Sequence, residues 1–305
     1  MAARRREAAA YHREVPSPKA ISGRRAARPR QVRSGADSAP QLARFARETA
    51  TAVGRWLALR RQRQRDVGAR TKHIGDPVTD LDLAGERRLR AAIAKRWPLH
   101  GFIGEETGAT EVGRSHVWIV DPIDGTANFA RNLQPWGVSV ACLRDGHPVA
   151  GAVYAHPEDV TIVAAHGEGA QVGRQRIRIP EHARLDADSV VGVQWLRGST
   201  RLTFLQRLLP TGTRVRVFGS TVVQLCDVAR GRLHANVQQQ GKIWDVAAAG
   251  LIVQEGGGVF SRWDGSPIFP CSSTELDRHH PSIAASPRVH RQLMGLLARR
   301  AVSST

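Results

Sequence analysis

Cysteine is scarce in this 305-residue chain, occurring only at Cys142, Cys226 and Cys271. Three is an odd number and the residues lie far apart, which excludes a disulfide framework and a cysteine-based metal knuckle. Long apolar runs are lacking too: the longest, Val246–Val253, has eight residues even when its glycine is counted. A membrane-spanning helix needs about 20. We therefore expect a globular protein without membrane spans, in a reducing compartment and most simply in the cytoplasm.

Acidic residues are few near the N-terminus. Residues 1–73 carry 19 Lys and Arg against 5 Asp and Glu, so they hold +14 of the chain's net charge of +18. Residues 1–39 have few large apolar side chains and cannot bury enough surface to offset their chain entropy, which predicts a disordered Arg-rich tail. The tail could be a dispensable solvated segment, an arm within residues 1–73 that contacts nucleic acid or another polyanion, or an organelle transit peptide.

Apolar periodicity predicts a helix over residues 41–65 and another over 82–96. Four short apolar runs follow, which we interpret as a largely antiparallel sheet: Val117–Val120, Gly137–Leu143, Val149–Ala155 and Thr161–Ala165. After Gly173, strand-like and helix-like segments alternate, as in an α/β layer. We predict an N-terminal α+β domain over residues 40–180 and a C-terminal α/β domain over residues 181–305. The expected helices of the second domain are 199–209, 220–230 and 245–255, and its expected strands are 190–193, 215–218, 233–237 and 283–285.

Carboxylates gather in four short motifs: Asp76–Asp82, Gly104–Glu106, Trp118–Phe129 and Trp244–Gly250. Each has an ordinary explanation when taken singly, since Asp-Gly is commonly a turn and Glu-Glu a solvated pair. The third motif is the most informative, because an apolar strand delivers Asp121 at its carboxyl end and Asp124 follows three residues later. Two carboxylates this close repel when ionised, and a hard divalent cation such as Mg²⁺ resolves the conflict.

Gly125 follows directly and permits a sharp turn. If a helix opens there, the backbone N–H groups of Gly125 and Thr126 would face an anion such as phosphate. Carboxylates that hold Mg²⁺ beside such a cradle are suited to phosphoryl chemistry.

Together these motifs resemble the inositol monophosphatase family of Mg²⁺-dependent, lithium-sensitive phosphatases. The family's D-x-V-T-x-x-D and G-E-E motifs match at Asp76–Asp82 and Gly104–Glu106. Its W-I-x-D-P-[IL]-D-G-T-x-N-F motif is complete from Trp118 to Phe129, and its W-D-x-A-A motif begins at Trp244. The resemblance covers roughly residues 41–295. It implies a sandwich of alternating helix and sheet layers, in which the C-terminal domain completes a metal site of the N-terminal domain, and a homodimer.

The resemblance also implies roles for individual residues. The metal ligands of two or three Mg²⁺ ions would be Glu105, Asp121, Asp124, Asp245 and the carbonyl of Ile123, with Glu106 close by. Asp82, Glu105 and Thr126 would take part in catalysis, with Thr126 paired to Asp82 beside the attacking water. Contacts to the substrate would come from Asp124, Gly125, Thr126, Ser220, Thr221, Gln238 and Asp245.

The implied activity is hydrolysis of a small phosphorylated metabolite, first of all inositol 1-phosphate. Inositol-cleaving members often carry Glu where this chain has Gln238, so histidinol phosphate, fructose 1,6-bisphosphate and 3′(2′),5′-bisphosphate nucleotides are alternatives. A different class of function is also open: the basic N-terminus could make the chain a nucleic-acid-binding or complex-assembly protein.

Overall fold

The computed structural model describes residues 37–64, 66–73, 76–181, 184–194, 199–271, 275 and 278–298. Most of the predicted tail of residues 1–39 therefore lies outside the described residues; Ala39 already belongs to the first helix. The helices are α1 (Ala39–Arg63), α2 (Asp80–Arg96), α3 (Thr126–Ala130), α4 (Ser199–Leu208), α5 (Thr221–Ala229), α6 (Ile243–Glu255) and α7 (Pro287–Ala298), with a 3-10 turn at Leu209–Thr211.

Fifteen strands occur in the described residues. A hairpin joins β1 (Arg70–His73) and β2 (Asp76–Val78). The larger sheet contains β3 (Gly101–Gly104), β4 (Gly108–Thr110), β5 (His116–Asp124), β6 (Trp136–Arg144), β7 (His147–His156), β8 (Val160–Ala165), β9 (Gly169–Val172) and β10 (Gln175–Ile177). The smaller sheet contains β11 (Val190–Val193), β12 (Arg214–Arg216), β13 (Ala235–Gln238), β14 (Val259–Arg262) and β15 (Ser282–Ala285).

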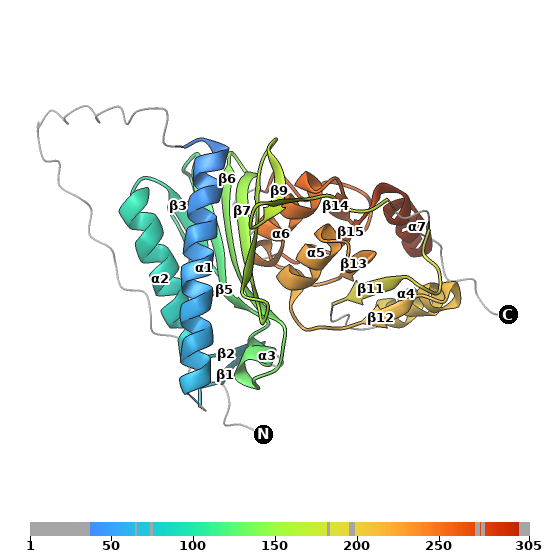
Figure 1. The fold of residues 1–305 in the computed structure, drawn as a ribbon, viewed down its shortest axis with the longest axis horizontal. Helices are drawn as coiled ribbons and strands as arrows, with labels where there is room; N and C mark the ends of the chain where they lie inside the picture. The colour runs from blue at the N-terminus through green and yellow to red at the C-terminus, as the bar shows by residue number, and fades with distance from the viewer. Residues whose placement is uncertain are drawn as a thin grey trace, which may run out of the picture. The chain divides into compact units, whose positions relative to one another are not determined.

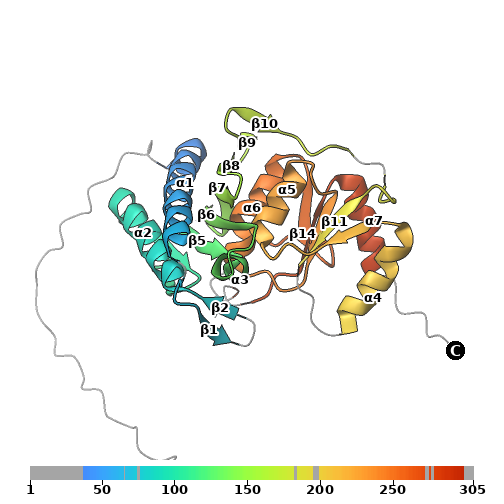
Figure 2. The same ribbon diagram turned by 60° about the horizontal axis from the view of Figure 1, so that its bottom comes forward.

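Helix layers and sheets alternate within residues 37–298 (Figure 1). The larger sheet has the order β10-β9-β8-β7-β6-β5-β3-β4 and is antiparallel except where β3 pairs with β5. The smaller sheet, β12-β11-β13-β15-β14, is mixed. Helices α1 and α2 cover one face of the larger sheet, and α5 and α6 lie between the two sheets. Helices α4 and α7 cover the other face of the smaller sheet (Figures 1 and 2). The predicted layered α+β and α/β sandwich is confirmed.

Each interface between layers has its own apolar core. The stripe of α1, with Leu42, Val53 and Leu57, packs against Trp118 and Tyr154 of the larger sheet. A second core lies between that sheet and the middle helices, and a third between the smaller sheet and α7. The middle helices are apolar on nearly every side because both of their faces are covered.

The predicted segments correspond to observed elements, with ends that differ by a few residues: some are longer, and others, such as the predicted helix over 220–230 and the predicted strand over 215–218, are shorter or shifted. The predicted strand at Val117–Val120 continues as β5 through Asp124, and the predicted helix over 41–65 is α1. The predicted sequence boundary at residue 180 falls between the last strand of one sheet and the first strand of the other. Because α5 and α6 contact both sheets, the described residues form one compact unit. The division into two domains stays a prediction. Among the described residues, no helix combines the length and apolar character needed to cross a membrane.

The tight fit of α1 on the sheet gives a stability prediction. A Cβ at Gly54 would overlap the buried ring of Tyr154 on β7. Replacing a helical glycine by alanine ordinarily stabilises by about 1 kcal/mol, but overpacking of a core costs about 1–3 kcal/mol. We expect Gly54→Ala to lower the free energy of unfolding, measured by urea denaturation, while Ala52→Ser on the exposed face of α1 changes it little. A more stable Gly54→Ala variant would contradict the packing.

Candidate functional site

The acidic motifs meet where β3 and β5 end. These strands run parallel, with Gly104 opposite Val120, and the N–H of Glu105 donates to the Val120 carbonyl at 3.3 Å. Neighbouring parallel strands run to the same edge of a sheet, so Glu105, directly after β3, and Asp121, near the end of β5, lie side by side. Their side chains are hydrogen-bonded to each other.

A one-residue bulge in β5 turns the side chain of Asp124 to the same face of the sheet as that of Asp121. Asp121 pairs with Ser139 on β6, but Asp124 pairs with Gly137, so three steps along β5 match two along β6. Side chains three residues apart in a regular strand point to opposite faces; the extra residue reverses that alternation. Pro122 lies inside the bulge, where its missing N–H costs no ladder hydrogen bond.

Helix α6 supplies the third aspartate. Asp245 lies in the first turn, and its Oδ2 accepts a hydrogen bond from the N–H of Lys242 at 2.7 Å. Ser139, the strand partner of Asp121, donates its hydroxyl to the carbonyl of Trp244 at 3.0 Å. The start of α6 is thereby tied to the strand position opposite Asp121.

The resulting cluster concentrates negative charge in a buried place. Asp121, Asp124 and Asp245 each offer a carboxylate oxygen, and these oxygens lie within 4.8 Å of one another. Burial raises the pKa of Asp121 well above its usual range, and the carboxylates of Glu105, Asp124 and Asp245 raise it further. The pKa of Asp245 rises for the same reasons, and burial raises that of Asp124 to about 6.

The turn before α5 holds Asp124. Its Oδ2 accepts hydrogen bonds from the N–H of Val222 at 2.9 Å and from the hydroxyl of Ser220, while Thr221 contributes a backbone hydrogen bond. Gly125 has a φ of 92°, and a Cβ there would come within 3.2 Å of Ser220. This position therefore requires glycine for both its backbone conformation and the close approach of the turn.

Asp82 and Thr126 form a pair beside the cluster. The Thr126 hydroxyl lies 3.1 Å from Asp82 Oδ1 and 2.8 Å from the carbonyl of Ile123. The other oxygen of Asp82 accepts from the N–H of Thr79 at 2.8 Å and from the Thr79 hydroxyl, in a capping box at the start of α2. Burial raises the pKa of Asp82 to about 6, although these donors lower it, and the charge of Glu106 acts in the same direction as burial.

The residues that the resemblance implies as substrate contacts differ in their positions. Ser220 and Thr221 lie at Asp124, as does Gly219 before them, whose φ is 83°. Gln238 is fully buried at the end of β13, where its Nε2 donates to the hydroxyl of Ser282 at 2.8 Å. Its Oε1 is buried without a hydrogen-bond partner, so the amide retains one acceptor.

The donor set fits a hard divalent cation. It consists of the carboxylate oxygens of the three aspartates. The Ile123 carbonyl, which lies 2.8 Å from the Thr126 hydroxyl, adds a further oxygen. Oxygen ligands of this kind suit Mg²⁺. The raised pKa values show that the ionised carboxylates are costly to bury together, and a divalent cation would remove that cost.

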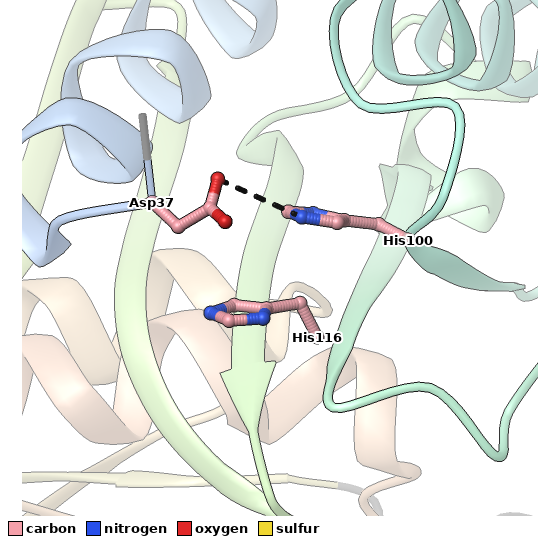
Figure 3. Close-up of side chains that lie close together, drawn as sticks. All are labelled: Asp37, His100 and His116. Carbon is pink, nitrogen blue, oxygen red and sulfur yellow. Dashed lines mark ion pairs between the residues drawn. The ribbon is translucent and has the colours of Figure 1, made fainter. Parts of the chain in front are cut away.

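A second group, formed by Asp37, His100 and His116, does not fit a metal ion (Figure 3). The imidazole rings are stacked, 4.8 Å apart at their centroids and 14° from parallel, whereas a bound ion lies near the plane of each ring that holds it. Trp118 Nε1 donates to His100 Nδ1 at 3.1 Å, and Arg144 Nε donates to His116 Nε2 at 3.0 Å. We interpret the group as a polar contact where the chain enters α1.

Three residues that hold the site were missed by the sequence analysis: Glu86, Asn128 and Ser139. Asn128 donates to the carbonyls of Pro135 and Phe218, at 2.8 and 2.7 Å, and so joins α3 to the turn before α5. Glu86 lies on the buried stripe of α2 together with Asp82, Leu89 and Ile93. A second acidic residue on the apolar stripe, one helical turn after Asp82, was the available signal.

Known proteins are similar to this chain in sequence and in fold. The sequence profile of the Inositol monophosphatase family matches residues 39–305. The chain is 33% identical over 248 residues to "Nus factor SuhB" of Pasteurella multocida, covering 79% of this chain and 90% of that protein. It is 35% identical over 208 residues to "Histidinol-phosphatase" of Mycobacterium tuberculosis, covering 66% and 79%. The crystal structure of extragenic suppressor protein suhB from Bartonella henselae superposes with a TM-score of 0.77 at 27% identity, covering 84% and 98%.

The layered sandwich is thus shared with proteins of this family. The chain belongs to the inositol monophosphatase family, a family of phosphatases.

The crowding of carboxylates predicts a stabilising substitution. A carboxyl group with a raised pKa in the folded state destabilises the fold progressively as pH rises from its unfolded value, near 4, through the folded value. Without divalent cations at pH 7, we expect Asp121→Asn to raise the free energy of unfolding by about 1 kcal/mol or more. The amide oxygen can still accept from the N–H of Ile123.

Thermal unfolding in EDTA, repeated between pH 5 and pH 8, measures this effect. Wild type should lose stability relative to Asp121→Asn as pH rises, and Mg²⁺ should stabilise wild type more than the variant. Asp188→Asn, in an exposed turn, serves as the control and should follow wild type. A variant less stable than wild type throughout would show that the carboxylates do not oppose folding.

Proposed function

We propose that this chain is a Mg²⁺-dependent phosphomonoesterase that hydrolyses a small phosphorylated metabolite, with inositol 1-phosphate as the first candidate substrate. The observation that carries the proposal is the buried cluster of Asp121, Asp124 and Asp245 beside the Asp82–Thr126 pair. Membership of a phosphatase family supports the reaction class.

The metal ligands in this proposal are Glu105, Asp121, Asp124, Asp245 and the Ile123 carbonyl, with Glu106 close by, and they hold two or three ions. When bound, Mg²⁺ supplies Lewis acidity, which lowers the pKa of water and offsets charge on the phosphate. The protein's part is to hold the carboxylates in fixed orientations: Ile123, Val222 and Lys242 each donate a backbone N–H to one of them.

Thr126 and Asp82 activate the attacking water. The Thr126 hydroxyl donates to Asp82 and can accept a hydrogen bond from water through a lone pair. As the water attacks phosphorus, its proton passes to Thr126 Oγ1 while the proton of that hydroxyl passes to Asp82 Oδ1. A pKa of about 6 suits Asp82 to accept a proton near neutral pH, because a general base works best when its pKa is near the working pH.

The substrate would be held beside the cluster, next to the attacking water. In this proposal the backbone N–H groups of Gly125 and Thr126 bind the phosphate, and Ser220, Thr221 and Gln238 contribute to recognition of the alcohol. The neutral amide of Gln238 can hydrogen-bond a hydroxyl group but offers no charge to an amine. The alternatives to compare with inositol 1-phosphate are fructose 1,6-bisphosphate, 3′(2′),5′-bisphosphate nucleotides and histidinol phosphate, whose amine Gln238 would leave without a charged partner.

Release of inorganic phosphate from these four substrates tests the proposal. Turnover should require Mg²⁺ and be inhibited by Li⁺, and Asp124→Asn should reduce kcat at least about a hundredfold with an unchanged circular dichroism spectrum. Activity that persists in EDTA, or in Asp124→Asn, would contradict the metal assignment.

The proton path makes a separate prediction. Thr126→Ser keeps the hydroxyl and should keep most of the activity, whereas Thr126→Val should lower kcat by about 10²–10⁴, the usual contribution of general base catalysis. Steady-state kinetics at saturating Mg²⁺ measure both variants. Equal activities for serine and valine would remove Thr126 from the reaction.

A second candidate function rests on the outer helices. The exposed cationic side chains of α1 and α2 outnumber the exposed acidic ones, and Trp56 lies between two of them: Arg88 at 4.2 Å and Arg60 at 5.7 Å from its ring. We propose that this face, with the basic residues 1–73, contacts nucleic acid or another polyanion, since arginine and aromatic side chains together bind phosphates and bases.

Binding of a labelled RNA oligonucleotide at several salt concentrations tests this contact. Affinity should fall steeply with salt, and both removal of residues 1–39 and the double substitution Arg60→Gln/Arg88→Gln should weaken it and flatten the salt dependence. Arg214→Gln on the exposed β12 is the matched control. Binding that ignores salt, or that the control impairs equally, would argue against the basic face.

The resemblance further supports a homodimer and a cytoplasmic location as proposals. Light scattering of the purified full chain would give the oligomeric state directly.

A further inference from the structure

Glu86 is a fully buried carboxylate outside the acidic motifs. It lies on α2, one helical turn after Asp82, and none of its surface is exposed. An ionised side chain so deeply buried is costly unless donors surround it. The donors come from the loop between β3 and β4, the loop that carries Glu105.

Both carboxylate oxygens of Glu86 accept hydrogen bonds from that loop. Oε2 accepts from the N–H of Glu106 at 2.8 Å, and Oε1 accepts from the N–H of Thr107 at 3.0 Å and from the Thr107 hydroxyl. The two amides directly after Glu105 are therefore fixed to α2. Hydrogen bonds to a charged acceptor are about twice as strong as neutral ones.

The glycine before Glu105 fits the same contact. A Cβ at Gly104 would overlap the carboxylate of Glu86. Glycine at this position lets the loop backbone approach the carboxylate closely. Glu105 is therefore flanked on both sides by contacts with Glu86. Gly104 precedes it and leaves room for the carboxylate, and the two backbone amides that follow it donate to that carboxylate.

The same face of α2 also contacts the other ligand loop. A Cβ at Gly85 would meet Pro122 at 3.1 Å, and Asp82 accepts from Thr126. Residues one helical turn apart on α2 therefore fix the segment around Asp121 and the segment around Glu105 relative to each other.

We propose that Glu86 is a positioning residue for the metal ligand Glu105: its carboxylate sets the distance between Glu105 and the three aspartates. This inference rests on the proposed function, because it assigns Glu86 a role in Mg²⁺ affinity. A carboxylate is required at this position. The side-chain amide of Gln has only one acceptor oxygen, and its NH₂ group would face the N–H of either Glu106 or Thr107.

The test compares Glu86→Gln with wild type by calorimetric titration of MgCl₂ into the EDTA-treated, dialysed full chain. We expect Mg²⁺ affinity to fall at least about tenfold in Glu86→Gln, with a matching rise in the Mg²⁺ concentration for half-maximal phosphate release. At saturating Mg²⁺, KM should stay within about twofold of wild type, because Glu86 does not touch the substrate. Glu48→Gln on the exposed face of α1 is the matched control.

A second pair of variants covers the case in which Glu86→Gln fails to fold. Thr107→Val removes one of the three donors and should weaken Mg²⁺ binding in the same direction by a smaller factor, while Thr107→Ser, which keeps the hydroxyl, should restore it. Hydrogen exchange of the segment around residues 104–107, measured without Mg²⁺, should be faster in Glu86→Gln and in Thr107→Val.

The outcomes separate the inference from the proposed function. Lower stability with unchanged Mg²⁺ affinity would overturn the positioning role and leave Glu86 a purely structural residue. Loss of kcat at saturating Mg²⁺ with unchanged affinity would overturn it in favour of a direct part in the reaction. Wild type that neither binds Mg²⁺ nor releases phosphate would refute the proposed function. Hydrogen exchange of residues 104–107 would then decide the role of Glu86 alone. Unchanged exchange in Glu86→Gln and Thr107→Val would show that Glu86 does not hold this loop, and faster exchange would show that it does.

Discussion

Mutual repulsion of carboxylates in a buried place is the constraint that the rest of this structure must satisfy. Asp121, Asp124 and Asp245 are brought within 4.8 Å, where burial and neighbouring charge both favour protonation. Hydrophobic burial in three cores supplies the free energy that keeps them together. Each aspartate then accepts a hydrogen bond from a backbone N–H, at 2.7 to 2.9 Å, that fixes its orientation, and Thr221 adds a second to Asp124.

These donors come from different layers of the sandwich. The loop of β5 holds Asp121, the start of α5 holds Asp124, and the start of α6 holds Asp245. The first turns of α2, α5 and α6 all contribute, and the N-terminal end of a helix favours negative charge. The site is therefore a property of the packing between layers, and no single segment contains it.

Much of this could be predicted from the sequence. The long periodic segments, such as α1, and the buried strands β5 to β8 have clear patterns, and the motifs around Glu105, Asp121 and Asp245 identify the cluster. Short strands such as β9, β10 and β14 were missed because three or four residues carry too little periodicity. Glu86 and Ser139 were missed because their roles depend on partners 20 and 105 residues away in the chain.

The position of Asp245 has a consequence for synthesis of the chain. A nascent polypeptide that ends before α6 already contains Glu105, Asp121 and Asp124 but lacks both Asp245 and the helix that fills the space between the two sheets. The strands of the larger sheet can pair early, yet the carboxylate cluster is complete only after α6, at residues 243–255, has left the ribosome. The carboxylate cluster thus forms late, and its completion requires α6 to be packed between the two sheets.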